Sequence, residues 1–210
     1  MHWRTHGAQR ASWPASWRTP FRPRWPLYGG RRRGVSGRAL WFRSPSPDAT
    51  RVAGRLLVGA IDERGAVIAL IGPLGAGKTL FVKGLAEGLG LDPASVASPT
   101  FVIASEYPAP GDRRLAHVDL YRLRSEAELE AAGFLDLLVP GAIVAVEWGD
   151  RLAGALPEDR LEVVLSRAAG GDARLVSVSA LGPLAEAILA RWRTLVGGDA
   201  GRAAALELER

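Results

Sequence analysis

The sequence contains no cysteine, and it contains no apolar run of the roughly 18 residues that a membrane-spanning helix needs. Disulfide bonds and thiolate metal sites are therefore excluded, and no membrane span is expected. Lysine is scarce too, because Lys78 and Lys83 are the only two. Neither follows an asparagine, so the Asn-Lys-x-Asp loop that commonly selects guanine is absent. The apolar content of 48% is nevertheless typical of a globular core.

Acidic residues are nearly absent from the first 50 positions. Residues 1–50 hold ten arginines, no lysine and one acid, Asp48, which gives a net charge of +9. Residues 51–210 hold 17 basic residues (27 − 10) and 21 acidic residues (22 − 1), which gives a net charge of −4. The overall charge of +5 therefore belongs to the first segment and does not indicate a nucleic-acid-binding fold.

Residues 1–43 contain five of the seven tryptophans, scattered among arginines and prolines, without a helical or strand period. Three interpretations are open. Such a tail could bind RNA by stacking and charge neutralisation, or it could be an organelle transit peptide. The third, which we favour, is an unstructured extension, which could lie upstream of the true start. We therefore expect a disordered extension over 1–43, a folded domain over 44–196 and a flexible tail over 197–210.

The stretch from Ala66 to Gly84 organises the rest of the chain. An apolar run, AVIALI, ends at Gly72, and the loop PLGAG leads to Lys78, Thr79 and an apolar-periodic segment. This order predicts a strand, a glycine-rich loop and a helix. The spacing is that of a phosphate-binding loop.

The residue types in this loop suit a triphosphate. Glycines let the backbone bend so that loop amides point at anionic oxygens, helped by the positive end of the helix dipole. The ammonium of Lys78 would reach the β- and γ-phosphates, and the hydroxyl of Thr79 would ligate Mg²⁺. The loop residues that we expect to bind the nucleotide are Gly72, Gly75, Ala76, Gly77, Lys78, Thr79 and Leu80.

Helix and strand patterns alternate along the first half of the domain. We predict helices over 44–60, 78–89, 125–132 and 183–196, and strands over 66–71, 101–103, 115–120, 142–146, 161–165 and 174–178. Alternation favours a mostly parallel sheet with helices on both faces. The short turn between the last two strands predicts an antiparallel edge. The predicted class is a three-layer α/β P-loop NTPase fold.

Two strand-end acids could fix the metal, Asp119 and Glu147. Glu147 follows the better apolar run, so the pattern alone favours it as the metal acid, but the pattern does not divide the roles of metal binding and water orientation. Thr100 could place a hydroxyl near the γ-phosphate, as switch segments do. His117 has no second histidine or cysteine nearby in the sequence, so we interpret it as a packing or strand residue and not as a metal ligand.

Four motifs occur in the order seen in the TsaE family: GPLGAGKT, SPTF, HVDLYRL and VEWGDR. Together they resemble these small P-loop ATPases, which are required for threonylcarbamoyladenosine modification of tRNA, over roughly residues 44–166. The resemblance implies that Asp119 is the Walker-B-like acid near Mg²⁺, which reverses the preference drawn from the pattern. It places Glu147 and Trp148 beside the γ-phosphate, with Glu147 serving hydrolysis together with Lys78 and the switch-like Thr100.

The resemblance also implies cofactors and partners. It implies ATP and Mg²⁺ as ligands, the TsaB and TsaD proteins as partners, tRNA as an indirect partner, and a cytoplasmic location. Such a subunit hydrolyses ATP and does not itself transfer the carbamoyl group. Two positions depart from the family: Pro73 replaces an acid, and Leu80 replaces a second threonine whose hydroxyl would be available to the α-phosphate.

Three other functions compete with this interpretation. A GTP switch lacks its guanine-selecting loop. A small-molecule kinase would need lid arginines, and Arg122, Arg124 and Arg151 could serve. An RNA-binding module would use the tail over 1–43, and its binding would fall steeply with salt.

Overall fold

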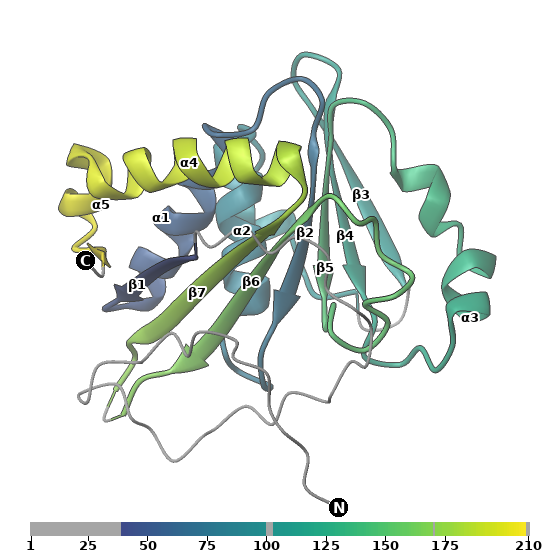
Figure 1. Ribbon diagram of the computed structural model, residues 1–210, viewed down its shortest axis with the longest axis horizontal. Helices are drawn as coiled ribbons and strands as arrows, with labels where there is room; N and C mark the ends of the chain where they lie inside the picture. The colour runs from purple at the N-terminus through teal and green to yellow at the C-terminus, as the bar shows by residue number, and fades with distance from the viewer. Residues whose placement is uncertain (1–38, 100–102, 170, 209–210) are drawn as a thin grey trace, which may run out of the picture.

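The computed structural model of the chain describes residues 39–99, 103–169 and 171–208 (Figure 1). Its elements, in chain order, are β1 (Leu40–Ser44), α1 (Pro47–Val58), β2 (Ala66–Ile71), α2 (Lys78–Gly88), the 3₁₀ turn η2 (Pro93–Ser95), β3 (Ala104–Ala109), β4 (Arg113–Asp119), α3 (Glu126–Ala131), the 3₁₀ turn η3 (Phe134–Leu137), β5 (Ala142–Glu147), β6 (Arg160–Arg167), β7 (Arg174–Leu181), α4 (Pro183–Gly197), α5 (Asp199–Ala203) and β8 (Glu207–Leu208).

The eight strands of the described residues form one mixed sheet in the order β3-β4-β5-β2-β6-β7-β1-β8. The central pairs β4–β5, β5–β2 and β2–β6 are parallel. The outer pairs β3–β4, β6–β7, β7–β1 and β1–β8 are antiparallel. The antiparallel pairing predicted for β6 and β7 is confirmed, but its predicted place at an edge of the sheet is wrong, because β1 and β8 lie beyond β7. A mostly parallel sheet is also wrong, because the strand pairs on both sides of the parallel centre are antiparallel. The reason at β3–β4 is a turn of three residues, 110–112, which is too short for a parallel crossover.

Apolar clusters lie on both faces of the sheet. Alternate residues of β5 serve the two faces: Ile143 and Ala145 join the cluster that holds α1, α2 and α4, whereas Val144 and Val146 join the one that holds α3 and η3. Figure 1 shows α1, α2 and α4 on one side of the sheet and α3 on the other. Helices therefore cover both faces, as the alternation predicts.

Helices α1 and α2 pack with almost no space between their backbones. A Cβ atom at Gly84 would lie 2.0 Å from the carbonyl oxygen of Arg51, and one at Gly54 would lie 2.3 Å from that of Phe81. Only glycine fits this crossing, which fixes the direction of the helix that begins at Lys78.

The variant Gly84→Ala is expected to lower the free energy of unfolding by about 2–3 kcal/mol, because the added methyl group must push two backbones apart. The matched control is Gly59→Ala. Gly59 has a φ of −65°, and a Cβ there would meet its nearest atoms at 3.4 Å. Urea unfolding of both variants is the measurement. Equal stability of the two variants would contradict the close crossing.

The first strand corrects the expected boundary of the domain. Residues 40–43, assigned above to the extension, belong to β1, where Leu40, Phe42 and Ser44 are buried and pair with β7. The ring of Phe42 packs edge-on against Trp192 of α4, with ring centroids 5.8 Å apart. Burial of this alternate face orders the segment. Residues 1–38 lie outside the described residues, and so does the prediction made for them.

The C-terminal segment is also more regular than expected. The flexible tail predicted over 197–210 contains α5 and β8, and Phe42 and Arg43 of β1 pair with Leu208 and Glu207 of β8. Backbone pairing with the edge of β1 holds β8 against the sheet.

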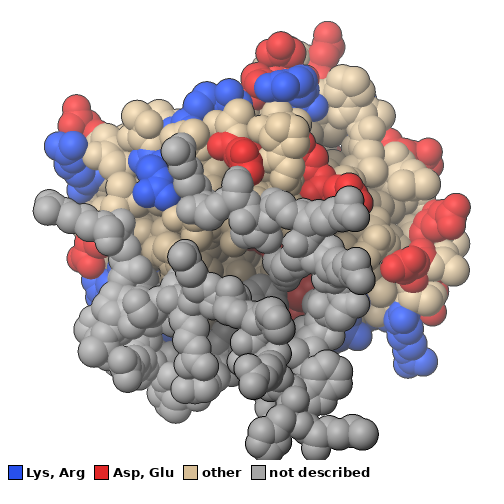
Figure 2. Space-filling view, in the orientation of Figure 1, with Lys and Arg blue, Asp and Glu red and all other residues tan. Residues whose placement is uncertain are grey.

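The other expected elements are largely confirmed. Ser46 caps α1, with its Oγ atom accepting from the backbone nitrogen of Ala49 at 3.1 Å, and Ser125 caps α3. The strand predicted over 101–103 falls mostly outside the described residues, and β3 begins at Ala104. Acidic side chains gather over α3, which carries three glutamates (Figure 2). No helix within the described ranges is both long and apolar enough to cross a membrane.

Candidate functional site

The phosphate-binding loop lies between the end of β2 and the start of α2, as the sequence predicts. Gly72, Gly75 and Gly77 have φ values of 147°, 74° and 106°, which favour glycine. A Cβ atom at Gly72 would lie 2.2 Å from the carbonyl oxygen of Leu165 on β6. The loop therefore needs its glycines for conformation and for close approach to the neighbouring strand.

Two arginines from the β6–β7 hairpin donate hydrogen bonds to backbone carbonyl oxygens of this loop. Arg174 donates from Nε to the carbonyl oxygen of Ala76 at 2.9 Å, and Arg167 donates from Nε to that of Gly75 at 3.3 Å. Because a trans peptide directs its N–H opposite to its C=O, the amide of Gly77 points away from Arg174. Burial lowers the pKa of Arg174, and the nearby charge of Arg167 lowers it further. The sequence pattern carries no signal for these contacts, since the hairpin is remote in the chain.

Lys78 is folded back over the loop. Its Nζ atom donates to the carbonyl oxygens of Gly72 at 2.8 Å and Pro73 at 3.1 Å, and it lies 3.8 Å from the ring centroid of Trp148. Burial lowers the pKa of Lys78, although Glu147 and other carboxylates act in the opposite direction. The ammonium therefore lies next to the phosphate-binding loop. There it can exchange these carbonyl oxygens for anionic oxygens, which accept stronger hydrogen bonds.

The two candidate acids are neighbours across β4 and β5, where Asp119 and Glu147 are paired in register. Thr79 donates from Oγ1 to Oε1 of Glu147 at 2.7 Å. Asp119 instead accepts from the hydroxyl of Ser98 at 3.0 Å and from the backbone nitrogen of Tyr121 at 2.8 Å. The structure therefore brings the loop threonine against Glu147 and places Asp119 beside the pair.

Trp148 is held in an uncommon backbone conformation. Its φ is 59°, in the left-handed region that few non-glycine residues adopt. The next residue, Gly149, packs closely against β2. Its backbone nitrogen donates to the carbonyl oxygen of Leu70 at 3.3 Å, and a Cβ atom at Gly149 would lie 2.7 Å from the Cβ atom of Ala69. The indole is therefore fixed over Lys78, and its ring centroid lies 5.1 Å from that of Tyr121.

His117 was interpreted from the sequence as a packing residue, and it is fully buried. Its Nε2 atom also lies 2.9 Å from Oε1 of Glu147. A period of two along β4 places His117 and Asp119 on one face, and only the β4–β5 register reveals that this face meets Glu147.

The donor set fits a magnesium ion. Mg²⁺ takes hydroxyl and carboxylate oxygens, and it usually keeps several waters and phosphate oxygens in place of a cage of protein ligands. Thr79, Glu147 and Asp119 supply such oxygens at one edge of the parallel strands. Within the part of the chain that the structure describes, no group of three or more histidines and acids could hold a metal by itself. Thr100, expected to be switch-like, lies outside the described residues.

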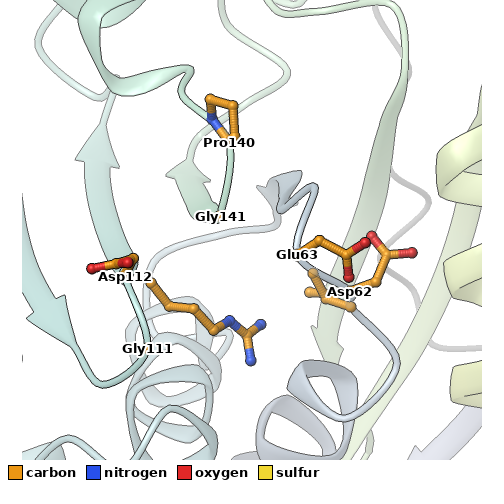
Figure 3. Close-up of a pocket in the computed structure, with 8 residues that line it drawn as sticks. Asp62, Glu63, Gly111, Asp112, Pro140 and Gly141 are labelled. Carbon is orange, nitrogen blue, oxygen red and sulfur yellow. The ribbon is translucent and has the colours of Figure 1, made fainter.

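A separate hollow of about 350 Å³ lies at the opposite end of the sheet (Figure 3). It is lined by segments that precede β2 and β5 and by the β3–β4 turn, among them Asp62, Glu63, Asp112 and Gly141. Arg64 donates to the carboxylate of Asp62 and lowers its pKa to about 2. The hollow lies at the amino ends of the parallel strands, so it is distinct from the phosphate-binding loop.

The chain is similar to known proteins over a stretch that includes β4 and β5, the strands that carry Asp119 and Glu147. A family model described as threonylcarbamoyl adenosine biosynthesis protein TsaE matches residues 44–175. The tRNA threonylcarbamoyladenosine biosynthesis protein TsaE of Bacillus subtilis is 39% identical over 143 residues, which cover 68% of this chain and 87% of that protein. The protein of the same name from Streptomyces coelicolor is 42% identical over 134 residues, which cover 62% of this chain and 85% of that protein. The crystal structure of Bacillus subtilis YdiB matches with a TM-score of 0.55 and 32% identity, over 79% of this chain and 96% of that chain.

Proposed function

The chain belongs to the TsaE family of threonylcarbamoyl adenosine biosynthesis proteins, and on that basis we propose that it binds and hydrolyses ATP in support of this tRNA modification. The observation that carries the proposal is the contact of Thr79 with Glu147 beside the ammonium of Lys78. A glycine loop, a cation, a hydroxyl and a carboxylate at one strand end are the parts that phosphoryl transfer needs. The fold proposed for these parts is the three-layer P-loop NTPase class.

The loop would bind the triphosphate through its backbone. Amides of Gly75, Gly77, Thr79 and Leu80 would donate to phosphate oxygens at the positive end of α2. The amide of Ala76 donates to the carbonyl oxygen of Pro73 at 3.1 Å and would exchange this acceptor for a phosphate oxygen. Lys78 would leave the carbonyls of Gly72 and Pro73 for the β- and γ-phosphates. Trp148 would lie beside the γ-phosphate, as the family resemblance implies. Thr79 and Asp119 would hold Mg²⁺, which when bound neutralises charge on the β- and γ-phosphate oxygens.

Glu147 would serve the hydrolytic step. Its carboxylate would accept a hydrogen bond from the attacking water and take up the proton that this water releases. The water oxygen bonds to the γ-phosphorus while the bond from that phosphorus to the β–γ bridging oxygen breaks, which yields ADP and phosphate. Thr100 would place its hydroxyl near the same phosphate.

The proposed biological setting follows the family. The chain would act in the cytoplasm with the TsaB and TsaD proteins and would meet tRNA only through that assembly. ATP hydrolysis would reset the assembly between modification cycles, and the transfer of the threonylcarbamoyl group would remain with the partners.

The test is Mg²⁺-dependent hydrolysis of ATP and of GTP, with and without the TsaB–TsaD pair and tRNA. We expect slow ATP hydrolysis by the chain alone and faster hydrolysis with the partners. A rate that is indifferent to the partners, or hydrolysis confined to GTP, would overturn the proposal. It would then direct the search to a phosphate acceptor, as a small-molecule kinase requires.

A further inference from the structure

We propose that His117 is a positioning residue that orients the carboxylate of Glu147 for hydrolysis. This inference rests on the function proposed above. It adds a functional role for His117, for which the sequence pattern indicated only a structural one. Its basis is a three-membered cluster in which one oxygen, Oε1 of Glu147, lies 2.9 Å from Nε2 of His117 and 2.7 Å from Oγ1 of Thr79.

The cluster is closed to solvent. His117 is 0% exposed and Glu147 is 3% exposed. A carboxylate oxygen only accepts hydrogen bonds, so we assign the imidazole proton to Nε2. The other ring nitrogen, Nδ1, is buried and has no hydrogen-bond partner among the described residues. An unprotonated Nδ1 at this buried position costs less free energy than a buried N–H group without an acceptor, and this supports the same tautomer.

The two donors come from different elements and share one oxygen. His117 lies on β4, Thr79 lies on α2, and Glu147 ends β5. Both hydrogen bonds to the carboxylate within the described residues end on Oε1, so they fix the plane of the group and leave Oε2 to accept from a water. A carboxylate held by Thr79 alone could rotate about that single bond.

A packing role and a positioning role make different demands on the side chain. Packing needs volume and shape at a buried site, whereas positioning needs a donor at the place of Nε2. The amide nitrogen of a glutamine side chain lies about as far from the backbone as the Nε2 atom of an imidazole. Asparagine carries the same group one carbon shorter, in the place of Nδ1. His117→Gln and His117→Asn are therefore a matched pair of neutral amides that differ in donor position.

The first measurement compares kcat and the ATP dissociation constant in the complete assembly with TsaB, TsaD and tRNA. We expect His117→Asn to lower kcat by about 10- to 100-fold, the usual loss for such supporting partners, with the dissociation constant changed by less than about threefold. His117→Gln should recover most of kcat. Equal kcat values for the two variants, or a loss confined to ATP affinity, would overturn the inference. Thermal melting of both variants shows that each is folded.

The second measurement does not depend on hydrolysis. Long-range ¹H–¹⁵N NMR of the imidazoles, assigned by comparison with His117→Gln, reports which nitrogen of His117 carries the proton. We expect the proton on Nε2, and we expect the Nε2 resonance to shift in Glu147→Ala, which removes the acceptor. A proton on Nδ1, or a spectrum unchanged in Glu147→Ala, would refute the contact. If the wild-type assembly hydrolyses no ATP, the proposed function fails, while this spectrum still decides the contact.

Discussion

Lys78→Ala is expected to remove ATP binding and to lower the rate of hydrolysis by about a thousandfold or more. The ammonium of Lys78 donates to the carbonyl oxygens of Gly72 and Pro73 in the loop, and the residue is 4% exposed. Without it, the negative charge of a bound triphosphate would face Glu147 and Asp119 with no compensating side chain from the loop. Calorimetric titration with ATP and Mg²⁺, followed by the hydrolysis assay, measures both effects.

The chain offers a matched control, because Lys83 is its only other lysine and lies on the same helix, α2. Lys83→Ala should keep both ATP binding and hydrolysis. Lys78→Ala should also keep its fold, since burial disfavours the charged ammonium and its removal relieves that cost. Normal turnover in Lys78→Ala, or equal losses in both variants, would refute the assignment of the site.

Glu147→Gln is expected to retain ATP binding and to lose hydrolysis by about 10²- to 10⁴-fold, because an amide cannot take the proton from water. The change keeps the size of the side chain and leaves an oxygen that can still accept from Thr79. Single-turnover hydrolysis, with ATP affinity measured in parallel, separates the chemical step from binding.

Asp119→Asn completes this experiment by testing the division of roles between the two acids. If Asp119 holds the metal, this variant should need a higher Mg²⁺ concentration to bind ATP, while Glu147→Gln should not. The reverse result would exchange the two roles. The contact of Thr79 with Glu147 makes that exchange a real alternative, because the loop threonine is the other expected metal ligand.

The phosphate-binding loop was predictable because its determinants are local. The apolar run of β2, the three glycines and the first turn of α2 lie within one short stretch, and each has a residue type that its conformation requires. The strand-end position of Glu147 follows from the apolar run of β5 in the same way.

Features that depend on remote partners were not predictable. Strand β1 has the short pattern LWFRS within an arginine-rich segment, and only pairing with β7 makes it a strand. The bond of His117 to Glu147 depends on the register between β4 and β5, which the pattern of either strand leaves open. Arg174 reaches Ala76 only because β6 lies next to β2.

The position of β1 has a consequence for how the domain is made. The strand is the first described element to leave the ribosome, but Leu40 pairs with Val178 and Phe42 pairs with Leu208. The phosphate-binding loop and its helix can form while β1 still has no partner strand. A nascent chain therefore carries a tryptophan-bearing strand without its β7 partner through most of its synthesis, which leaves that strand open to pairing with another chain.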